Sequence, residues 1–259
     1  MTKKQSKIQD SQVKSQAKVK QDSIQVLEQG ETARRSAIIL HLTSLPSPFG
    51  IGVIGEEAIQ FAEKLAESET AYWQILPLYL PIDNSPYNSL STFAGNTMLI
   101  DPRGLVKMGL LAKDELQDFY YPGPPHSVDY NFVRQNSQSY LQRAFSRLNA
   151  QQKDELAAFI QKQDWIANYA TFRVLKDSHE EVWWKWPLEI RAYSTDIVKK
   201  VQEEEAEAFY FYCFGQWLFQ KQWQDLREAC HELGVGILGD IPYYVAADGA
   251  DTWSNAANF

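Results

Sequence analysis

The sequence predicts an α/β fold in which a small parallel sheet is interrupted by a long helical block. Two short apolar runs of the kind found in buried strands lie about 30 residues apart, with an amphipathic segment between them. A strand, a helix and a second strand in this order are typical of a βαβ unit, whose strands are parallel. About 130 residues of helical periodicity follow, and then comes a third apolar run. With 259 residues, of which 44% are hydrophobic, the chain is long enough for a sizeable core.

The first predicted strand covers residues 36–42, where a nearly continuous apolar run predicts burial on both faces. A loop rich in Pro and Gly follows at 43–55. Residues 56–69 have the spacing of an amphipathic helix, with two acidic residues in the first turn, where the helix dipole favours them. The second predicted strand covers residues 72–78.

The middle of the chain is predicted to be helical at four places, namely 113–119, 132–148, 153–178 and 203–233. The last segment contains Cys213 and Cys230 on its apolar face, so we expect both to be buried packing residues and not reactive thiols. Gly234 is expected to end this helix. The third predicted strand is 235–241, and residues 250–259 are expected to be loop.

Charge and composition exclude several classes of function. Residues 1–35 carry eight Lys/Arg and four Asp/Glu, whereas the whole chain has a net charge of −8 and a pI near 5.1. Such acidity argues against a nucleic-acid partner. No apolar run is long enough to span a membrane, and two cysteines form neither a disulfide framework nor a zinc pattern. Residues 1–33, which lack aromatic residues, are predicted to be a disordered tail, and the cytoplasm is the expected compartment.

Polar side chains gather after each predicted strand, where parallel α/β folds place their functional groups. They are His41 after the first strand, the loop 83–96 after the second, and Asp240 with the loop 243–253 after the third. All three segments mix hydroxyl, amide and carboxyl groups with aromatic rings. This mixture suits a neutral polyhydroxylated ligand, because rings cover the apolar face of a sugar while polar groups bind its hydroxyls.

Each of these features has a simpler structural interpretation. His41 is expected in the first place to be a core histidine with its hydrogen bonds satisfied, residues 85–87 could form an ordinary turn, and Asp240 could cap a helix. Packing within the helical block is the favoured role of Trp183, Trp184 and Trp186, and helix capping or surface exposure that of Asp248 and Asp251. The segment GIGVIG has the letters of a nucleotide-binding loop, but a Pro-rich stretch precedes it and no acid follows at the required distance.

Several longer motifs then follow one another in order. They are RRSAIILHLTSLPSPFGIGVIG at 34–55, YWQILPL at 72–78, SPYNSLSTFAGNTMLID at 85–101, VDYNFV at 128–133, DWIANYATFRVLKDSH at 164–179, WWKWP at 183–187, QWLFQKQW at 216–223 and GDIPYYVAADGADTW at 239–253. In this order they resemble the 4-α-glucanotransferases, also called amylomaltases or disproportionating enzymes, of glycoside hydrolase family 77.

The resemblance implies a (β/α)₈ barrel of the TIM type with a large inserted helical subdomain, incomplete in this chain. About three of the eight barrel strands would be present. Residues 34–103 would hold strands one and two, 104–233 the inserted subdomain, and 234–259 strand three with the start of its loop. The family transfers α-1,4-glucan segments between maltooligosaccharides by a retaining double displacement, without a metal or an organic cofactor.

The resemblance also implies the substrate-binding residues. Ser85 and Tyr87 match residues that line the donor sugar beside the cleaved bond, Asp240 matches an acid that supports this subsite, and Trp253 matches an aromatic residue flanking the glucan groove. The three catalytic carboxylates of the family lie further along its sequence, so no catalytic residue is identified in this chain. The isolated chain is therefore expected to be inactive, and its open sheet edge is expected to promote aggregation.

Two departures from the family pattern concern substrate preference more than membership. Val53 replaces the acid of GIGDLG, and Gly249 replaces the serine of VAxDSADVW. Two alternatives to a transferase remain open from the sequence. One is a glucan-binding module or decayed gene product without catalysis, and the other is a hydrolase built on the same barrel.

Overall fold

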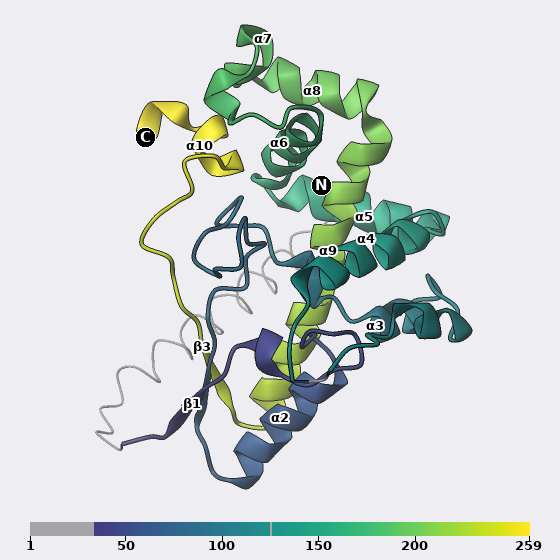
Figure 1. The fold of residues 1–259 in the computed structure, drawn as a ribbon, viewed down its shortest axis with the longest axis vertical. Coiled ribbons are helices and arrows are strands. Elements are labelled where there is room, and N and C mark those ends of the chain that lie inside the picture. The colour runs from purple at the N-terminus through teal and green to yellow at the C-terminus, as the bar shows by residue number, and fades with distance from the viewer. Residues whose placement is uncertain (1–33, 125) are drawn as a thin grey trace, which may run out of the picture. The chain divides into compact units, whose positions relative to one another are not determined.

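The computed structural model describes residues 34–124 and 126–259. The predicted disordered tail, residues 1–33, lies outside the described residues. Residues Ser36–Phe259 form one compact unit, in which a small sheet and a set of helices share a continuous apolar core. Figure 1 shows the strands on one side of this unit and the longest helix, α9, passing beside them.

Three short strands form a parallel sheet, as the sequence predicts. The strands lie in the order β1-β2-β3, and each is shorter than the apolar run that predicted it. Ile38 pairs with Trp73, which in turn pairs with Ile237. The strands are β1 (Ala37–Ile39), β2 (Tyr72–Gln74) and β3 (Gly236–Leu238).

Burial of the first strand on both faces, as expected from its apolar run, is wrong. Ile38 is 43% exposed and Ile39 is 63% exposed, because the described residues do not cover both faces of β1, which lies at the edge of the sheet. The central strand is covered: Trp73 is 1% exposed, lies edge-on to Phe61 and donates a hydrogen bond from Nε1 to the Leu40 carbonyl at 2.7 Å. An apolar run predicts burial only where another layer of structure covers it.

The predicted amphipathic helix is α2 (Glu56–Glu67), and its buried face consists of Ala58, Ala62 and Leu65. The helical block contains several further elements. They are α3 (Pro102–Lys107), α4 (Tyr130–Phe145), α5 (Ala150–Lys162), α6 (Ile166–Ser178), α7 (Leu188–Arg191), α8 (Thr195–Glu204) and α9 (Ala206–Glu232). Helix α9 contacts α2, α4, α5, α6 and α8 before it leads into β3, so it joins the sheet to the helical block (Figure 1).

Two of the predicted helices are interrupted. The segment 153–178 breaks between Lys162 and Ile166, where the Trp165 indole donates a hydrogen bond to the Gln163 side chain. The segment 203–233 spans the end of α8 and the start of α9, with the break at Glu205. Apolar spacing continues across both breaks, and periodicity alone therefore does not locate them.

Two other predictions of secondary structure need correction. The segment predicted as a helix at 113–119 forms a 3₁₀ helix, Asp114–Phe119. Residues 250–259, expected to be loop, contain α10 (Ala250–Ser254) and a 3₁₀ turn, Ala256–Asn258. Both segments are short and lack the repeated apolar spacing by which sequence analysis finds helices.

The apolar face of α9 is buried as predicted. Cys213 and Cys230 are free thiols within the core, and burial raises the pKa of both, to about 11 for Cys230. Such thiols stay protonated at neutral pH and are inert, in agreement with a packing role. Gly234 follows the helix with a φ of +73°, the left-handed conformation that favours glycine at a helix end.

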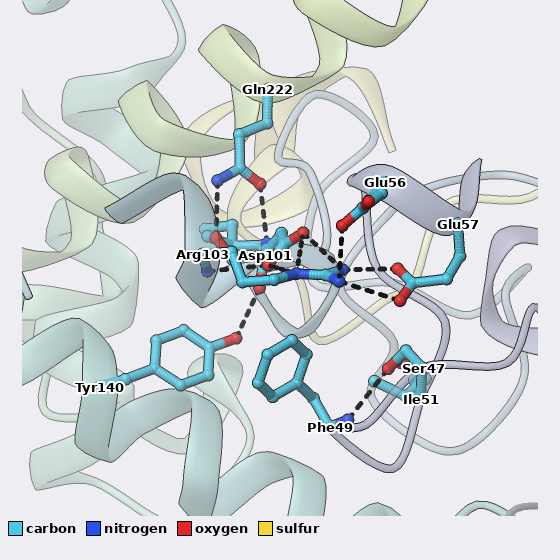
Figure 2. Close-up of polar contacts among 10 residues, drawn as sticks. Ser47, Phe49, Ile51, Glu56, Glu57, Asp101, Arg103, Tyr140 and Gln222 are labelled. Carbon is cyan, nitrogen blue, oxygen red and sulfur yellow. Dashed lines mark hydrogen bonds and ion pairs between the residues drawn. The ribbon is translucent and has the colours of Figure 1, made fainter. Parts of the chain in front are cut away.

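Two glutamines on the buried face of α9 hold the segment that follows β2. The Gln216 amide accepts a hydrogen bond from the Gly95 N–H at 2.7 Å and donates one to the Gly95 carbonyl at 3.1 Å. Gln222 does the same at Asp101, at 2.7 and 2.9 Å (Figure 2). Each side-chain amide thus forms hydrogen bonds with both the N–H and the C=O of one buried residue, as a neighbouring strand would.

Asp101 also anchors an ion network at the start of α2. The Arg103 guanidinium lies 2.8 Å from the Asp101 carboxylate and 2.5 Å from that of Glu57, and it lies over the Phe49 ring (Figure 2). Burial acts to raise the pKa of Glu57, but the hydrogen bonds from Arg103 hold it below its usual value. The network fixes α2 against α3.

The same close packing explains the glycines of GIGVIG. A Cβ atom at Gly52 would lie 1.8 Å from the Leu42 carbonyl oxygen, and one at Gly55 would lie 1.8 Å from the Asp101 carboxylate. Neither position leaves room for a side chain. Backbone approach within the fold therefore accounts for these two glycines without a nucleotide.

The glutamine pairs lead to a prediction about stability. We expect Gln216→Ala to lower the free energy of unfolding by about 2–4 kcal/mol, because it leaves both polar groups of Gly95 buried without partners. Gln224→Ala is the matched control, since Gln224 lies on the exposed face of α9 and bonds only Glu228. Pulse proteolysis in urea at low protein concentration measures both. An equal loss of unfolding free energy in the two variants would contradict the prediction that the hydrogen bonds between Gln216 and Gly95 stabilise the fold.

Candidate functional site

The loops after β2 and β3 meet at a hydrogen bond between two of the predicted site residues. The Tyr87 hydroxyl donates to the Asp240 carboxylate at 2.7 Å, across 153 positions of sequence. Tyr87 is 44% exposed, and the hydrogen bond to Asp240 raises its pKa. Because parallel strands end at the same edge of a sheet, their loops converge there. The two residues therefore present a phenol and a carboxylate together at the surface.

Ser85 lies in a tight turn beside this pair. The Asp83 carboxylate accepts hydrogen bonds from the Ser85 N–H at 2.8 Å and from the Asn88 side chain at 3.0 Å. The Ser85 hydroxyl accepts a hydrogen bond from the Tyr87 N–H at 3.4 Å. The simpler interpretation of this segment as a turn is thus correct, and the turn is also what presents Tyr87 to Asp240.

Asp251 ties the loop after β2 to helix α10. Its carboxylate accepts hydrogen bonds from the Ser91 hydroxyl at 2.9 Å, from the Thr92 N–H at 2.6 Å and from the Thr92 hydroxyl at 2.8 Å. The Ala250 N–H donates to the Leu90 carbonyl nearby. Asp251 is therefore a link between two loops, and its expected role as a cap or surface acid is wrong.

Asp248 ties the loop after β3 to the helical block. It accepts hydrogen bonds from the Lys176 ammonium at 2.6 Å and from the Trp183 N–H at 3.1 Å, and the Trp183 indole donates to the Ala247 carbonyl at 2.7 Å. The expectation of a surface acid is again wrong. No local pattern in the sequence signals these contacts, since the partners lie more than 60 positions apart.

The three tryptophans of WWKWP have different environments. Trp186 is buried and packs against Phe172 in the helical block, as the favoured interpretation predicts. Trp183 anchors the loop after β3 through the contacts described above. Trp184 is 43% exposed and lies edge-on to Trp183.

Trp253 lies apart from the Tyr87–Asp240 pair. It is fully buried, with Tyr193 edge-on at 5.3 Å, Phe172 at 6.0 Å, and its indole N–H donating to the Ile190 carbonyl. A ring covered in this way supports the packing of α10 on the helical block. It offers no free face on which a sugar could stack, so the expected position of Trp253 beside a glucan groove stays a prediction.

His41, at the end of β1, is only partly as expected. It lies in the interior, but its Nδ1 atom is buried without a hydrogen-bond partner among the described residues. Burial lowers the pKa of His41 to about 4. The imidazole is therefore neutral at physiological pH, and the interpretation of a histidine with satisfied hydrogen bonds is wrong for this atom.

Exposed rings follow directly after Asp240. Ile241 is 77% exposed, Tyr243 is 98% exposed and Tyr244 is 85% exposed. Sequence analysis noted these tyrosines only as part of a mixed loop. Like Tyr87 and Asp240, these tyrosines are presented by the loops that follow the strands, and exposed rings and hydrogen-bonding groups of this kind are suited to binding a sugar. One carboxylate held by a phenol is not the pair of carboxyl groups that cleaves a glycosidic bond.

Comparisons with known proteins identify the family. The family model described as 4-alpha-glucanotransferase matches residues 40–259. The chain belongs to this family. Its 4-alpha-glucanotransferase relative from Aquifex aeolicus is 36% identical over 87% of the chain, and the relative from Thermus thermophilus is 37% identical over 87%. These alignments cover 46% and 45% of the two relatives, so the chain spans about half the length of the curated family members it matches.

Solved structures of family members share the fold. The amylomaltase from Streptococcus agalactiae in complex with acarbose superposes with a TM-score of 0.82 at 31% identity, over 87% of this chain and 47% of that one.

The Arabidopsis thaliana relative, named as chloroplastic/amyloplastic, is 35% identical over 88% of the chain and 41% of its own length. In the described part of the chain, no helix is both long enough and apolar enough to cross a membrane.

His41 leads to a prediction about pH. The unfolded chain binds a proton on this residue near pH 6.5 and the folded chain near pH 4, so the folded state is favoured fully above 6.5 and loses stability as the pH falls toward 4. In His41→Gln, we expect the free energy of unfolding to fall by about 2–3 kcal/mol less than in the wild type between pH 6.5 and pH 4. Urea unfolding midpoints at several pH values measure the slope, with His231→Gln on the exposed side of α9 as control. An unchanged slope in His41→Gln would contradict the prediction.

Proposed function

We propose that this chain forms the donor-sugar side of a 4-α-glucanotransferase, which moves α-1,4-glucan segments between maltooligosaccharides. The observation that carries the proposal is the Tyr87–Asp240 hydrogen bond, because it joins at one exposed place the two strand-end loops that the family resemblance assigns to substrate. Family membership supports the reaction class, and the acarbose complex of the Streptococcus agalactiae amylomaltase supports an oligosaccharide-like ligand.

The proposed fold of the whole enzyme is a (β/α)₈ barrel. Residues 34–103 would supply its first two strands, 104–233 the inserted helical subdomain, and 234–259 the third strand with the start of its loop. The parallel order β1-β2-β3 supports this assignment. Exposed apolar side chains on the outer strands, such as Ile39 and Leu238, support it as well, because further barrel strands would cover them.

Ser85, Tyr87 and Asp240 are the proposed substrate-binding residues. Asp240 holds the phenol of Tyr87 in one orientation, so that the ring edge and both polar groups face a bound sugar together. Trp253 would act through packing, by keeping α10 and the loop after β3 in place. The nucleophile and the general acid of the double displacement would come from the half of the enzyme that this chain does not span, and the chain alone is proposed to be inactive.

A glucan-binding module without catalysis is the second candidate. It is favoured by one observation, the aromatic surface of Tyr87, Tyr243 and Tyr244, which this chain presents without help from further residues. This candidate expects binding of maltooligosaccharides but no turnover even when the remaining strands are supplied. The cytoplasmic location stays a prediction, since the named plant relatives are plastid proteins.

The substrate-binding assignment predicts a selective loss of affinity. We expect Tyr87→Phe to weaken maltoheptaose or acarbose binding about 5- to 20-fold, since one hydrogen bond at the sugar and the orientation by Asp240 are lost. Isothermal titration calorimetry measures the affinity. Tyr120→Phe is the matched control, because it removes a hydroxyl of similar exposure on the α3 side of the molecule. Equal affinity in wild type and Tyr87→Phe would rule out the assignment.

If this chain supplies substrate binding and the remaining half of the enzyme supplies the catalytic carboxyl groups, transfer activity is expected only when both halves are present. Incubated with maltotriose, the chain alone should produce neither glucose nor longer glucans above background. Fused to the C-terminal remainder of the Aquifex aeolicus relative, it should produce both, as chromatography of the products would show. Asp240→Asn in the fusion should lower kcat/KM about tenfold or more. Binding without any turnover in a folded fusion would favour the module instead.

A further inference from the structure

A cavity of about 510 Å³ lies behind the loop that carries Ser85 and Tyr87, and neither residue lines it. Its walls come from α4 and α6, which both contact α9, from α9 itself, and from Leu80, Pro81 and Ile82 at the base of the loop. Its volume is in the range of sites for small molecules. It is separate from the Tyr87–Asp240 pair.

Among the charged side chains of the cavity wall, the basic ones outnumber the acidic one. Arg134 on α4 and Arg173 on α6 both line it, and neither takes part in an ion pair within residues 34–124 and 126–259. Arg173 is half-buried, and its guanidinium lies 4.5 Å from the centre of the Tyr212 ring. It also interacts with Tyr169 and, beyond ion-pair distance, with the Asp177 carboxylate. An arginine is charged at any physiological pH, and a partly buried arginine without a close ion pair is stabilised by an anion that enters the cavity. This arrangement favours an anionic ligand.

The other charged groups of the cavity already have partners. Lys176 is bonded to the Asp248 carboxylate and to the Glu181 carbonyl. Asp177, the acid in the wall, accepts a hydrogen bond from the Tyr212 hydroxyl. Among the described residues, the two arginines are therefore the charged groups of the wall without a carboxylate at ion-pair distance.

A neighbouring cavity carries the opposite charge. It has a volume of about 1090 Å³, and Asp177, Phe211 and Tyr212 form part of the wall shared by the two. Its other charged lining residues are Lys153 and three acids, Glu204, Glu205 and Glu207. In a chain of net charge −8, an anion is thus repelled from the larger cavity and from most of the surface, and the arginine cavity is the favourable place for it.

We propose that the arginine cavity binds a phosphate group, either as free phosphate or on a sugar of about the size of a hexose monophosphate. A guanidinium fork matches phosphate oxygens with two parallel hydrogen bonds, and such charge-assisted bonds are strong. Thr97, Ser137 and Gln138 also line the cavity and supply polar groups for sugar hydroxyls. The site does not depend on the proposed glucan transfer, because it uses none of Ser85, Tyr87 and Asp240.

Calorimetric titration of the 259-residue chain tests the proposal with three probes, inorganic phosphate, glucose 6-phosphate and glucose. We expect at least one phosphate-bearing probe to bind, and glucose to bind at least about tenfold more weakly than the better of the two. Tighter binding of glucose 6-phosphate than of phosphate identifies a sugar phosphate as the ligand, and the reverse order identifies free phosphate. Absence of phosphate binding up to 10 mM, or equal binding of glucose and glucose 6-phosphate, overturns the proposal.

Three variants locate the site. Arg173→Met keeps an unbranched apolar stem but removes the guanidinium and its charge, and should weaken phosphate binding about 10- to 100-fold. Arg134→Met, at the exposed rim, should weaken it about 3- to 10-fold and serves if the interior change prevents folding. Arg227→Met is the control, since it makes the same change on the exposed side of α9, outside the cavity. Unchanged binding in a folded Arg134→Met and Arg173→Met pair refutes the site.

Discussion

Two buried side-chain amides determine where the loop after β2 lies, and the rest of the functional surface depends on that loop. Backbone polar groups inside a protein need partners, and a long loop has no neighbouring strand to supply them. Gln216 and Gln222 take the place of such a strand. They are six positions apart on α9 and bind peptide units that are also six positions apart, Gly95 and Asp101. Phe219 lies between the two glutamines, and its ring packs so closely on Gly95 that a Cβ atom there would lie 2.2 Å away.

The exposed Tyr87–Asp240 pair is positioned by contacts that lie deeper in the protein. A hydrogen bond as exposed as that between Tyr87 and Asp240 contributes little to stability by itself, because water competes for both groups. Its geometry is set instead by anchors on either side. Asp251 fastens the loop after β2 to α10, and Asp248 fastens the loop after β3 to the helical block. The site residues can therefore stay exposed to a ligand while their backbone is fixed.

The sequence predicts the parts of this arrangement that depend on local pattern. Three apolar runs with a helix between the first two predict parallel strands, and parallel strands bring loops 153 positions apart to the same edge. What covers an apolar group depends on tertiary packing, which no local pattern specifies. For this reason the exposure of Ile39 differs from expectation. The glutamines did leave a signal, because Gln216 and Gln222 lie at helical spacing from the buried Cys213 and Leu226. A polar residue within an apolar stripe indicates a buried hydrogen bond.

The Tyr87–Asp240 pair and the outer strands of the sheet differ in how far this chain completes their surroundings. Contacts that position the loops of Tyr87 and Asp240 come from α9, α10 and the helical block. The outer strands, in contrast, present apolar side chains at Ile38, Ile39 and Leu238. Under the proposed function, binding of a donor sugar would use the fold described here, whereas attack on its anomeric carbon would use carboxyl groups placed opposite by further strands. In an enzyme built in this way, recognition of the donor and cleavage of its bond would depend on different stretches of sequence. Substitutions in the anchors of the first stretch should affect substrate affinity before they affect the chemical step.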